Sequence, residues 1–333
     1  MNPESVSKSR SRRSGGTRQV QHVGVELNAV MVAVVDDEPQ VLVRPAVDGG
    51  GEALPSGPLE SRHRTLELGL RAWIREHTRQ PVGYVEQLYT FGDRDRHPKA
   101  QGARERMVSI GYLALISAAS ATHSLPAGWR NWYGYFPWED WRAGEPETLQ
   151  WIRRLCKQWI AAAAMKAERG LRTERVRAAF GSGNQPWNEE LVLERYELLY
   201  EIGLVPEAHR DHVNVWASSE KVLGHGKPML ADHRRILATA IARLRGKIKY
   251  RPVVFELMPR TFTLSQLQRT VEALAGVRLH KPNFRRIVES QQLVEETGDF
   301  VSDTRGRPAR LVRFRQEVMP DRLMLAARLP VAR

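Results

Sequence analysis

The feature that most constrains this chain of 333 residues is a pair of short helical patterns between residues 263 and 290. Residues 263–266 read Thr-Leu-Ser-Gln, a capping box in which the Thr263 hydroxyl accepts from the Gln266 amide and the Gln266 side chain reaches back. Gly276 should end this helix, because glycine readily adopts the positive φ of a helix C-terminus. Pro282 then stands in the first turn of a second helix, where no amide is needed. The pattern predicts a helix-turn-helix.

The second of these helices has two chemically different faces. Phe284, Ile287 and Val288 have the spacing of side chains that pack inward, so the predicted outward residues are Lys281, Asn283, Arg285, Arg286 and Glu289. Arginine and asparagine read guanine and adenine edges with two hydrogen bonds each. We therefore predict that Lys281, Asn283, Arg285 and Arg286 bind DNA in a major groove. The alternative, a solvated charged face, would more usually mix glutamate with lysine.

A predicted β-hairpin follows the second helix. Leu293-Val294 and residues 311–314 have the character of strands, and the loop between them contains Arg305-Gly306-Arg307-Pro308. A hairpin after a recognition helix is a wing, and arginines at its tip are suited to a narrow minor groove, where the negative potential is enhanced. Arg305 and Arg307 are therefore predicted DNA contacts. We assign residues 225–320 to a winged helix-turn-helix.

The distribution of charge agrees with a polyanionic partner. Residues 225–333 contain 22 lysines and arginines against 10 acids, whereas residues 21–224 contain 24 against 27. Some of the positive charge lies on a helix predicted at 232–249, where the arginines flank an apolar face. Residues 1–20 are expected to form a disordered basic tail. An RNA-binding function is the disfavoured alternative, because no array of stacking aromatic residues accompanies the basic helix.

The first two thirds of the chain mix strands and helices. Apolar runs at 30–35 and 40–44 predict a hairpin, Leu66, Leu70, Trp73 and Ile74 predict a helix, and strand patterns follow at 83–91 and 107–116. Residues 145–205 are predicted to be a helical insertion, a hairpin of two helices at 149–160 and 189–202. Residues 218–229 are the candidate linker. The tryptophans at 129–141 are assigned to the core, with a stacking surface as the alternative.

Composition excludes several other classes of protein. The chain has no apolar run of about 18 residues and no signal peptide, so we expect a cytoplasmic protein without a membrane span. Its one cysteine, Cys156, excludes an internal disulfide and a cysteine-rich metal site. We expect Cys156 to be a buried small apolar residue.

At this point the sequence resembles the Nudix-related transcriptional regulators of NAD metabolism, the NrtR-like family. The resemblance rests on residues 83–93, 236–257, 262–269, 283–286 and 305–309, and within the family it is nearest to the NadQ-type repressors of de novo NAD biosynthesis. It implies an α+β chain, with a Nudix-like α/β/α sensor domain over residues 21–220 and a C-terminal winged helix. It also implies a homodimer, a double-stranded DNA operator, and an effector such as NAD, ATP or ADP-ribose.

The segment that corresponds to the Nudix motif lacks most of its acidic residues. A Nudix hydrolase uses clustered helix carboxylates to hold Mg²⁺ against a pyrophosphate. Aligned on Gly57, the acidic positions hold His63, Ala72 and Arg75, and only Glu76 is acidic. One carboxylate does not fix a metal on a diphosphate. We therefore predict no catalytic residue, no metal and no catalytic cofactor, against the alternative of a Nudix-type nucleotide diphosphate hydrolase with a nucleic-acid-binding domain.

A phosphate-binding fold without its metal still offers a place for an anionic ligand. The candidate ligand-binding residues are Arg44, Arg71 and Arg94 for phosphate, and Tyr89 and Phe91 for stacking on a base. Each also has a plain interpretation as surface charge or as a core ring. We predict that effector binding shifts the spacing of the two recognition helices in the dimer.

Overall fold

The computed structural model describes residues 23–45, 51–78, 82–93, 106–117, 128–182, 185–211, 215–218, 222, 226–301 and 308–315. The predicted basic tail lies outside the described residues, and so do Arg94, Arg305 and Arg307.

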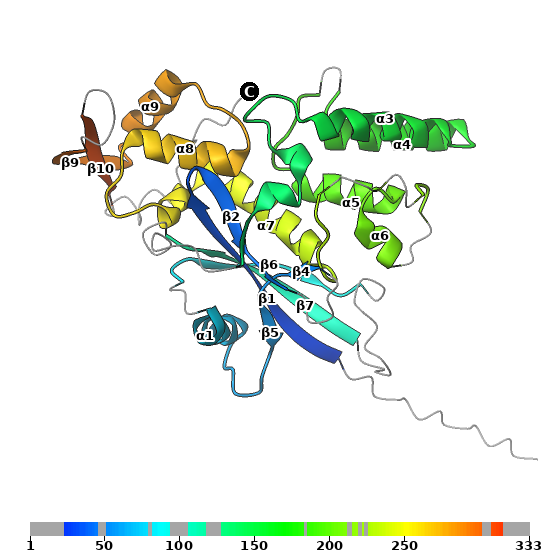
Figure 1. The fold of residues 1–333 in the computed structure, drawn as a ribbon, viewed down its shortest axis with the longest axis horizontal. Helices are drawn as coiled ribbons and strands as arrows, with labels where there is room; N and C mark the ends of the chain where they lie inside the picture. The colour runs from blue at the N-terminus through cyan, green and yellow to red at the C-terminus, as the bar shows by residue number, and fades with distance from the viewer. Residues whose placement is uncertain are drawn as a thin grey trace, which may run out of the picture.

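A mixed β-sheet organises the N-terminal part (Figure 1). Its strands are β1 (Val23–Val35), β2 (Glu38–Leu42), β5 (Ser56–Pro58), β6 (Val85–Phe91), β7 (Arg106–Leu115) and β8 (Trp129–Asn131). The order is β6-β7-β1-β2-β8, and β5 also pairs with β1. Strands β1 and β7 run parallel, whereas the other pairs are antiparallel. A separate small ribbon is formed by β3 (Arg44–Pro45) and β4 (Glu52–Ala53).

The predicted first hairpin is confirmed, and its apolar run has a simple cause. Asp36 and Asp37 connect β1 to β2 with φ of 52° and 62°, the left-handed pair typical of a two-residue hairpin turn. Along β1, residues 30, 32 and 34 enter one apolar cluster and residues 29, 31 and 33 enter another. Because both faces of this part of the strand are buried, residues 29–35 are apolar at every position rather than at alternate ones.

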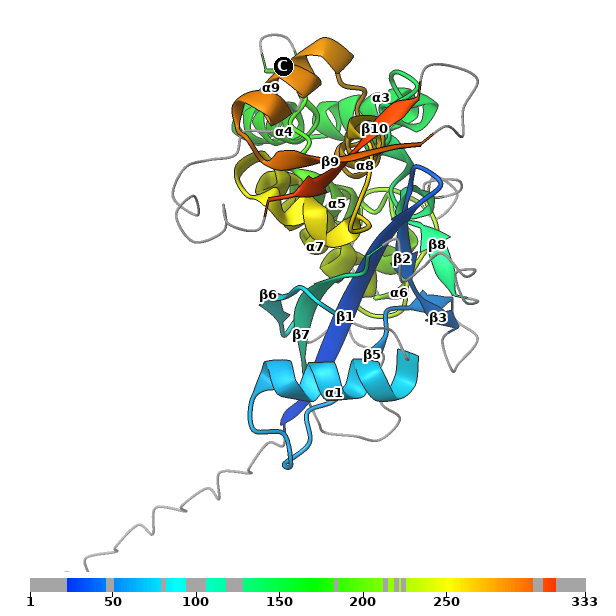
Figure 2. The ribbon, with the colours of Figure 1, turned by 90° about the vertical axis from the view of Figure 1, so that its left-hand side faces the viewer.

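Helices cover both faces of the sheet (Figure 2). On one face lies α1 (Leu66–Thr78), which buries Leu70, Trp73 and Ile74 as predicted. On the other face lie the 3-10 helices η2 (Trp132–Gly134) and η3 (Pro137–Glu139) together with α7 (His233–Tyr250), and α5 (Val192–Ile202) packs against α7. This confirms the predicted α/β/α layers. Trp132 and Trp138 are fully buried, so these two tryptophans belong to the core and not to a stacking surface.

The helical insertion contains one more helix than we predicted. It comprises α3 (Glu147–Ala161), α4 (Lys166–Phe180) and α5, and a short α6 (Pro206–Arg210) follows. The predicted pairing of 149–160 with 189–202 is wrong, because α3 forms its hairpin with α4. The sequence does not show α4 clearly, since Ala179 and Phe180 are its only buried residues. Cys156 on α3 is buried as expected, and burial raises the pKa of its thiol to about 12.

The C-terminal part contains the predicted winged helix. After η5 (Pro252–Leu257) come α8 (Leu264–Ala275), α9 (Lys281–Ser290), β9 (Val294–Val301) and β10 (Ala309–Phe314). The described part of the candidate linker is packed rather than free. Met229 is fully buried and bridges to Glu52 of β4, and the Leu230 amide donates to the Glu52 carbonyl at 3.0 Å. None of the described helices is long and apolar enough to cross a membrane.

Candidate functional site

The helix-turn-helix has the local geometry that its sequence predicts. The Gln266 amide donates to the Thr263 hydroxyl at 3.1 Å, and the Thr263 amide donates to the Gln266 side chain at 2.7 Å. Gly276 ends α8 in the left-handed conformation with φ of 74°. Pro282 lies in the first turn of α9. The capping box therefore fixes the start of α8, and Gly276 and Pro282 stand at the two ends of the turn between α8 and α9.

A carboxylate that sequence reasoning missed organises this turn. Glu272, near the end of α8, accepts from the Leu279 amide at 3.0 Å, from the Gln268 side chain at 2.8 Å and from Arg278 at 2.8 Å. Burial alone would raise the pKa of Glu272, but these donors stabilise its charged form and hold the pKa below its usual value. The spacing of Gln268 and Glu272 on one helix face was the available signal.

Helix α9 presents the predicted face to solvent. Phe284 and Val288 are fully buried beneath it, whereas Ile287, which we predicted to pack inward, is only half-buried. The outward residues are all exposed, namely Lys281, Asn283, Arg285, Arg286 and Glu289. Among the described residues, none forms a salt bridge or side-chain hydrogen bond with Lys281, Asn283, Arg285 or Arg286. Their donors are therefore available to an external acceptor.

Strands β9 and β10 form the antiparallel wing behind α9. Arg310 pairs with Glu296 at 2.6 Å and Arg313 with Glu295 at 2.5 Å across the two strands. The predicted wing-tip arginines are outside the described residues. The bridge between Phe262 and Val312 attaches the wing to the start of the helix-turn-helix.

Apart from the exposed Arg243, the basic residues of α7 do not form the exposed positive surface that the charge count suggested. Arg234 and Arg245 are fully buried, and they pair with Glu207 and Glu139 at 3.1 and 2.7 Å. Lys247 pairs with Glu86 at 2.6 Å. Arg235 and Lys249 also pair with acids from the first two thirds of the chain. Part of the charge asymmetry between the two parts of the chain is therefore internal ion pairing.

One buried cluster joins the sheet domain, the insertion and the winged helix. The Glu139 carboxylate accepts from Arg195 of α5 at 2.6 and 2.9 Å and from Arg245 of α7 at 2.7 Å. Arg245 also donates to the Leu274 carbonyl of α8 at 3.0 Å. A β-carbon on Gly276 would lie 2.4 Å from the Glu139 carbonyl oxygen, so the end of α8 touches this segment directly. Sequence reasoning did not identify this cluster.

The helix that corresponds to the Nudix motif uses its residues for packing and surface contacts. A β-carbon on Gly57 would lie 2.1 Å from Trp73 Nε1, so this glycine makes room for the tryptophan. Arg71 donates to the carbonyls of Val82 and Gly83 at 3.1 and 3.2 Å, and it pairs with Glu67 at 2.8 Å. Glu76 is exposed. In the described ranges, no three metal-ligating side chains come together.

The described ligand candidates lie on two faces of the sheet. On the α1 face, Arg44 is exposed and its guanidinium lies 5.2 Å from the centre of the Trp73 ring, while Arg71 is held as described above. On the α7 face, Phe91 is a core residue at 2% exposure beneath Arg235. Tyr89 is 63% exposed, and its ring meets the edge of Phe91 at 5.5 Å. The structure therefore does not bring these residues into one pocket.

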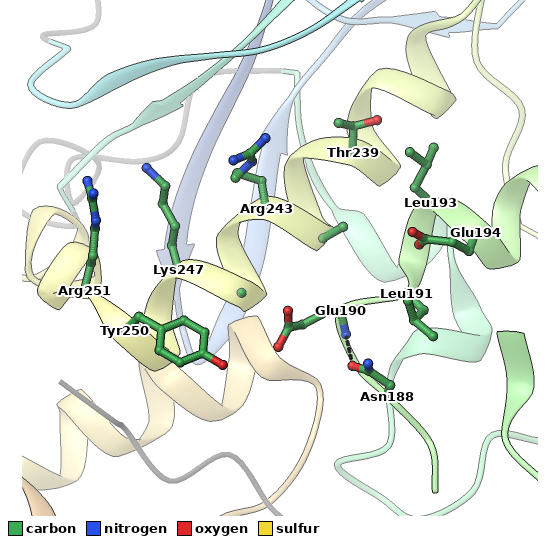
Figure 3. A pocket seen from close by; sticks show the side chains of 12 residues that line it. Asn188, Glu190, Leu191, Leu193, Glu194, Thr239, Arg243, Lys247, Tyr250 and Arg251 are labelled. Carbon is green, nitrogen blue, oxygen red and sulfur yellow. Dashed lines mark hydrogen bonds between the residues drawn. The ribbon is translucent and has the colours of Figure 1, made fainter. Parts of the chain in front are cut away.

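A groove of about 530 Å³ lies between α5 and α7 (Figure 3). Arg243 and Lys247 of α7 and Arg251 just after it stand on one side, and Glu190 and Glu194 lie on the side of α5. None of the four described ligand candidates lines it. Because the walls carry opposite charges, the groove has no clear preference for an anion.

A helix-turn-helix with a two-stranded wing, joined to an α/β/α domain, defines a winged-helix protein with a Nudix-like domain. Residues 254–314 match the NrtR DNA-binding winged helix domain. The chain is 40% identical over 107 residues to the ADPR responsive transcriptional repressor NtrR of Acinetobacter baylyi, a match that covers 32% of this chain and 41% of that protein. The chain thus spans less than half the length of this curated relative.

Solved structures show the same fold over most of the chain. Shewanella oneidensis NrtR complexed with a 27mer DNA matches with a TM-score of 0.51 and 20% identity, over 87% of this chain and 93% of that one. A second structure of Shewanella oneidensis NrtR gives the same TM-score and identity, over 90% of this chain and 96% of that one. The winged helix is therefore of the NrtR type, and the chain as a whole is NrtR-like in architecture.

Proposed function

We propose that this chain is a dimeric DNA-binding repressor of NAD biosynthesis genes, whose Nudix-like domain senses ADP-ribose or a related adenine nucleotide. The observation that carries the proposal is the outer face of α9, where Lys281, Asn283, Arg285 and Arg286 are exposed and have no partner among the described residues. This donor set suits the base edges of a major groove. The NrtR-type winged helix at 254–314 supports the same function.

DNA binding is tested with an operator obtained by selection from random duplexes. Arg286→Ala should weaken binding by about 5- to 150-fold, the equivalent of one lost base contact of about 1–3 kcal/mol. Arg313→Ala is a matched control, because it removes an arginine already paired with Glu295 on the wing. Unchanged affinity of the Arg286 variant at moderate salt would contradict the role assigned to α9.

Arg307→Ala should chiefly relax the preference for AT-rich flanks.

The effector is proposed to be ADP-ribose, ahead of NAD and ATP. Support comes from the relative in Acinetobacter baylyi, which is named as ADPR responsive. A ligand that binds only the folded state raises the apparent melting temperature. Thermal shift against ADP-ribose, NAD and ATP should therefore rank ADP-ribose first. Because Arg44 and Tyr89 lie on different faces of the sheet, only one of Arg44→Ala and Tyr89→Ala should reduce that shift, and the one that does identifies the face that binds the nucleotide. No shift with any of the three nucleotides would contradict the sensing role.

We propose that the Nudix-like domain does not hydrolyse its ligand. Support comes from α1, where Ala72 and Arg75 occupy acidic positions of the hydrolase motif and Glu76 is the one acid left. Pure protein incubated with ADP-ribose and Mg²⁺ should release no AMP above the background. Measurable Mg²⁺-dependent hydrolysis would instead favour the alternative, a nucleotide diphosphate hydrolase with a nucleic-acid-binding domain.

A further inference from the structure

The α3–α4 hairpin is a second basic element at the same end of the molecule as α9. Figure 1 shows α9 and the hairpin together at the top, and Figure 2, turned by 90°, keeps both at the top. Residues 147–180 contain 8 lysines and arginines against 3 acids. A duplex held by α9 and extended across this end of the molecule would therefore meet the hairpin.

The outer face of α3 has the composition of a phosphate-binding surface. The residues that α3 buries are Leu149, Ile152, Leu155, Cys156 and Trp159. The opposite face consists of the exposed residues Glu147, Gln150, Arg154, Lys157, Gln158 and Ala161. It has no large apolar side chain, and its one acid, Glu147, is confined to the first turn, seven residues before Arg154. Hydrogen-bond donors and cations on one helix face are the groups that proteins use on a DNA backbone.

The cations of this face are free to bind an anion. Elsewhere on the hairpin, Arg153 pairs with Glu145, Arg172 with Glu168, Arg175 with Glu201, and Arg177 with Glu174. Arg154 and Lys157, by contrast, form no salt bridge within the described part of the chain. Two unpaired cations one turn apart, beside glutamines, match successive phosphates better than they match an apolar partner.

We propose that the outer face of α3 binds the phosphates of DNA flanking the site that α9 reads, through Arg154 and Lys157. This inference rests on the proposed function, because α9 must hold the duplex first. The 15 residues of α3 span roughly 22 Å, which is the length of about six to seven base pairs. Contacts to phosphates alone would add affinity and position the duplex without adding base preference.

The test compares a short duplex, which ends at the α9 site, with a duplex that extends at least 15 base pairs beyond it on both sides (lengths chosen as roughly twice the span of α3). In the full chain, the double variant Arg154→Gln/Lys157→Gln should bind the long duplex about 10-fold or more weakly at 0.1 M salt. The slope of log affinity against log salt should become shallower by about 1.8, because two phosphate contacts are lost. Binding to the short duplex should not change.

The matched control is Arg175→Gln/Arg177→Gln, which removes the same charge from α4, where both arginines are already paired. An equal loss of affinity in the control would show that only the net charge of the hairpin matters, and it would overturn the proposal. An unchanged salt slope in the α3 variant would overturn it as well. A changed oligomeric state by light scattering, with an unchanged slope, would make the hairpin a contact between copies of the chain. If the wild type fails to bind even the short duplex, the proposed function itself is wrong.

Discussion

At the scale of single residues, the site divides into positions that the sequence predicts and positions that it does not. The capping box, Gly276 and the outward residues of α9 were predicted because each of them depends only on residues that are near it along the chain. Glu139 was not predicted, because its partners Arg195 and Arg245 are 56 and 106 residues away. A buried carboxylate between two guanidiniums leaves no local pattern in a sequence.

Glu139→Gln should destabilise the protein strongly. It removes the one anion that two buried guanidinium groups share, and breaking such a buried pair costs about 3–5 kcal/mol. The free energy of unfolding from urea titration measures the loss. Glu174→Gln is the control, since it breaks an exposed pair with Arg177 and should cost about 1 kcal/mol or less. Similar losses in the two variants would show that the Glu139 cluster contributes little to stability.

At the scale of elements, helices with strong amphipathic patterns were predicted and α4 was not. Helix α4 is mostly exposed, so its sequence has no apolar stripe for periodicity to detect. The turn between α8 and α9 was located from its capping signals, but the Glu272 contacts that hold its backbone were not. This turn decides how α9 is oriented relative to α8.

Ionised Glu272 should make the stability of the winged helix depend on pH. Its pKa in the folded state is lower than in the unfolded state, so its contribution is present above the unfolded value near 4.5 and is lost as pH falls through the folded value. Unfolding free energies of wild type and Glu272→Gln, measured from pH 6 down to pH 3 (a range of roughly 1.5 units around that value), should therefore converge on acidification. A constant difference between the two proteins would show that the charge of Glu272 does not matter.

At the scale of the whole molecule, the sequence predicts two domains, but in the structure both share one continuous apolar core. A single apolar cluster includes Val30 of β1, Leu199 of α5, Ile241 of α7 and Val312 of β10. Helix α7 lies at its centre, since it contacts the sheet, α5 and α8. The sequence predicted the elements on either side, but a helix that serves two domains looks the same locally as one that serves a single domain.

The chain should consequently unfold in one transition. Its 9 tryptophans all precede residue 225, so tryptophan fluorescence reports only the first two thirds of the chain. A thiol-reactive dye attached to the Ser290→Cys variant, at the end of α9, reports the unfolding of the winged helix. The two probes should give the same urea midpoint, because the elements share a core. An earlier midpoint for the dye would show that the winged helix unfolds on its own.

Helix α9 is attached to the rest of the protein by very few side chains. Phe284 and Val288 are the residues that it buries fully, and its outward positions are exposed. Substitutions at those outward positions therefore leave the core and the Glu139 cluster unaltered. Under the proposed function, such a chain can acquire new target genes over evolutionary time by changing a few side chains on α9, while the domain proposed to bind the effector stays the same.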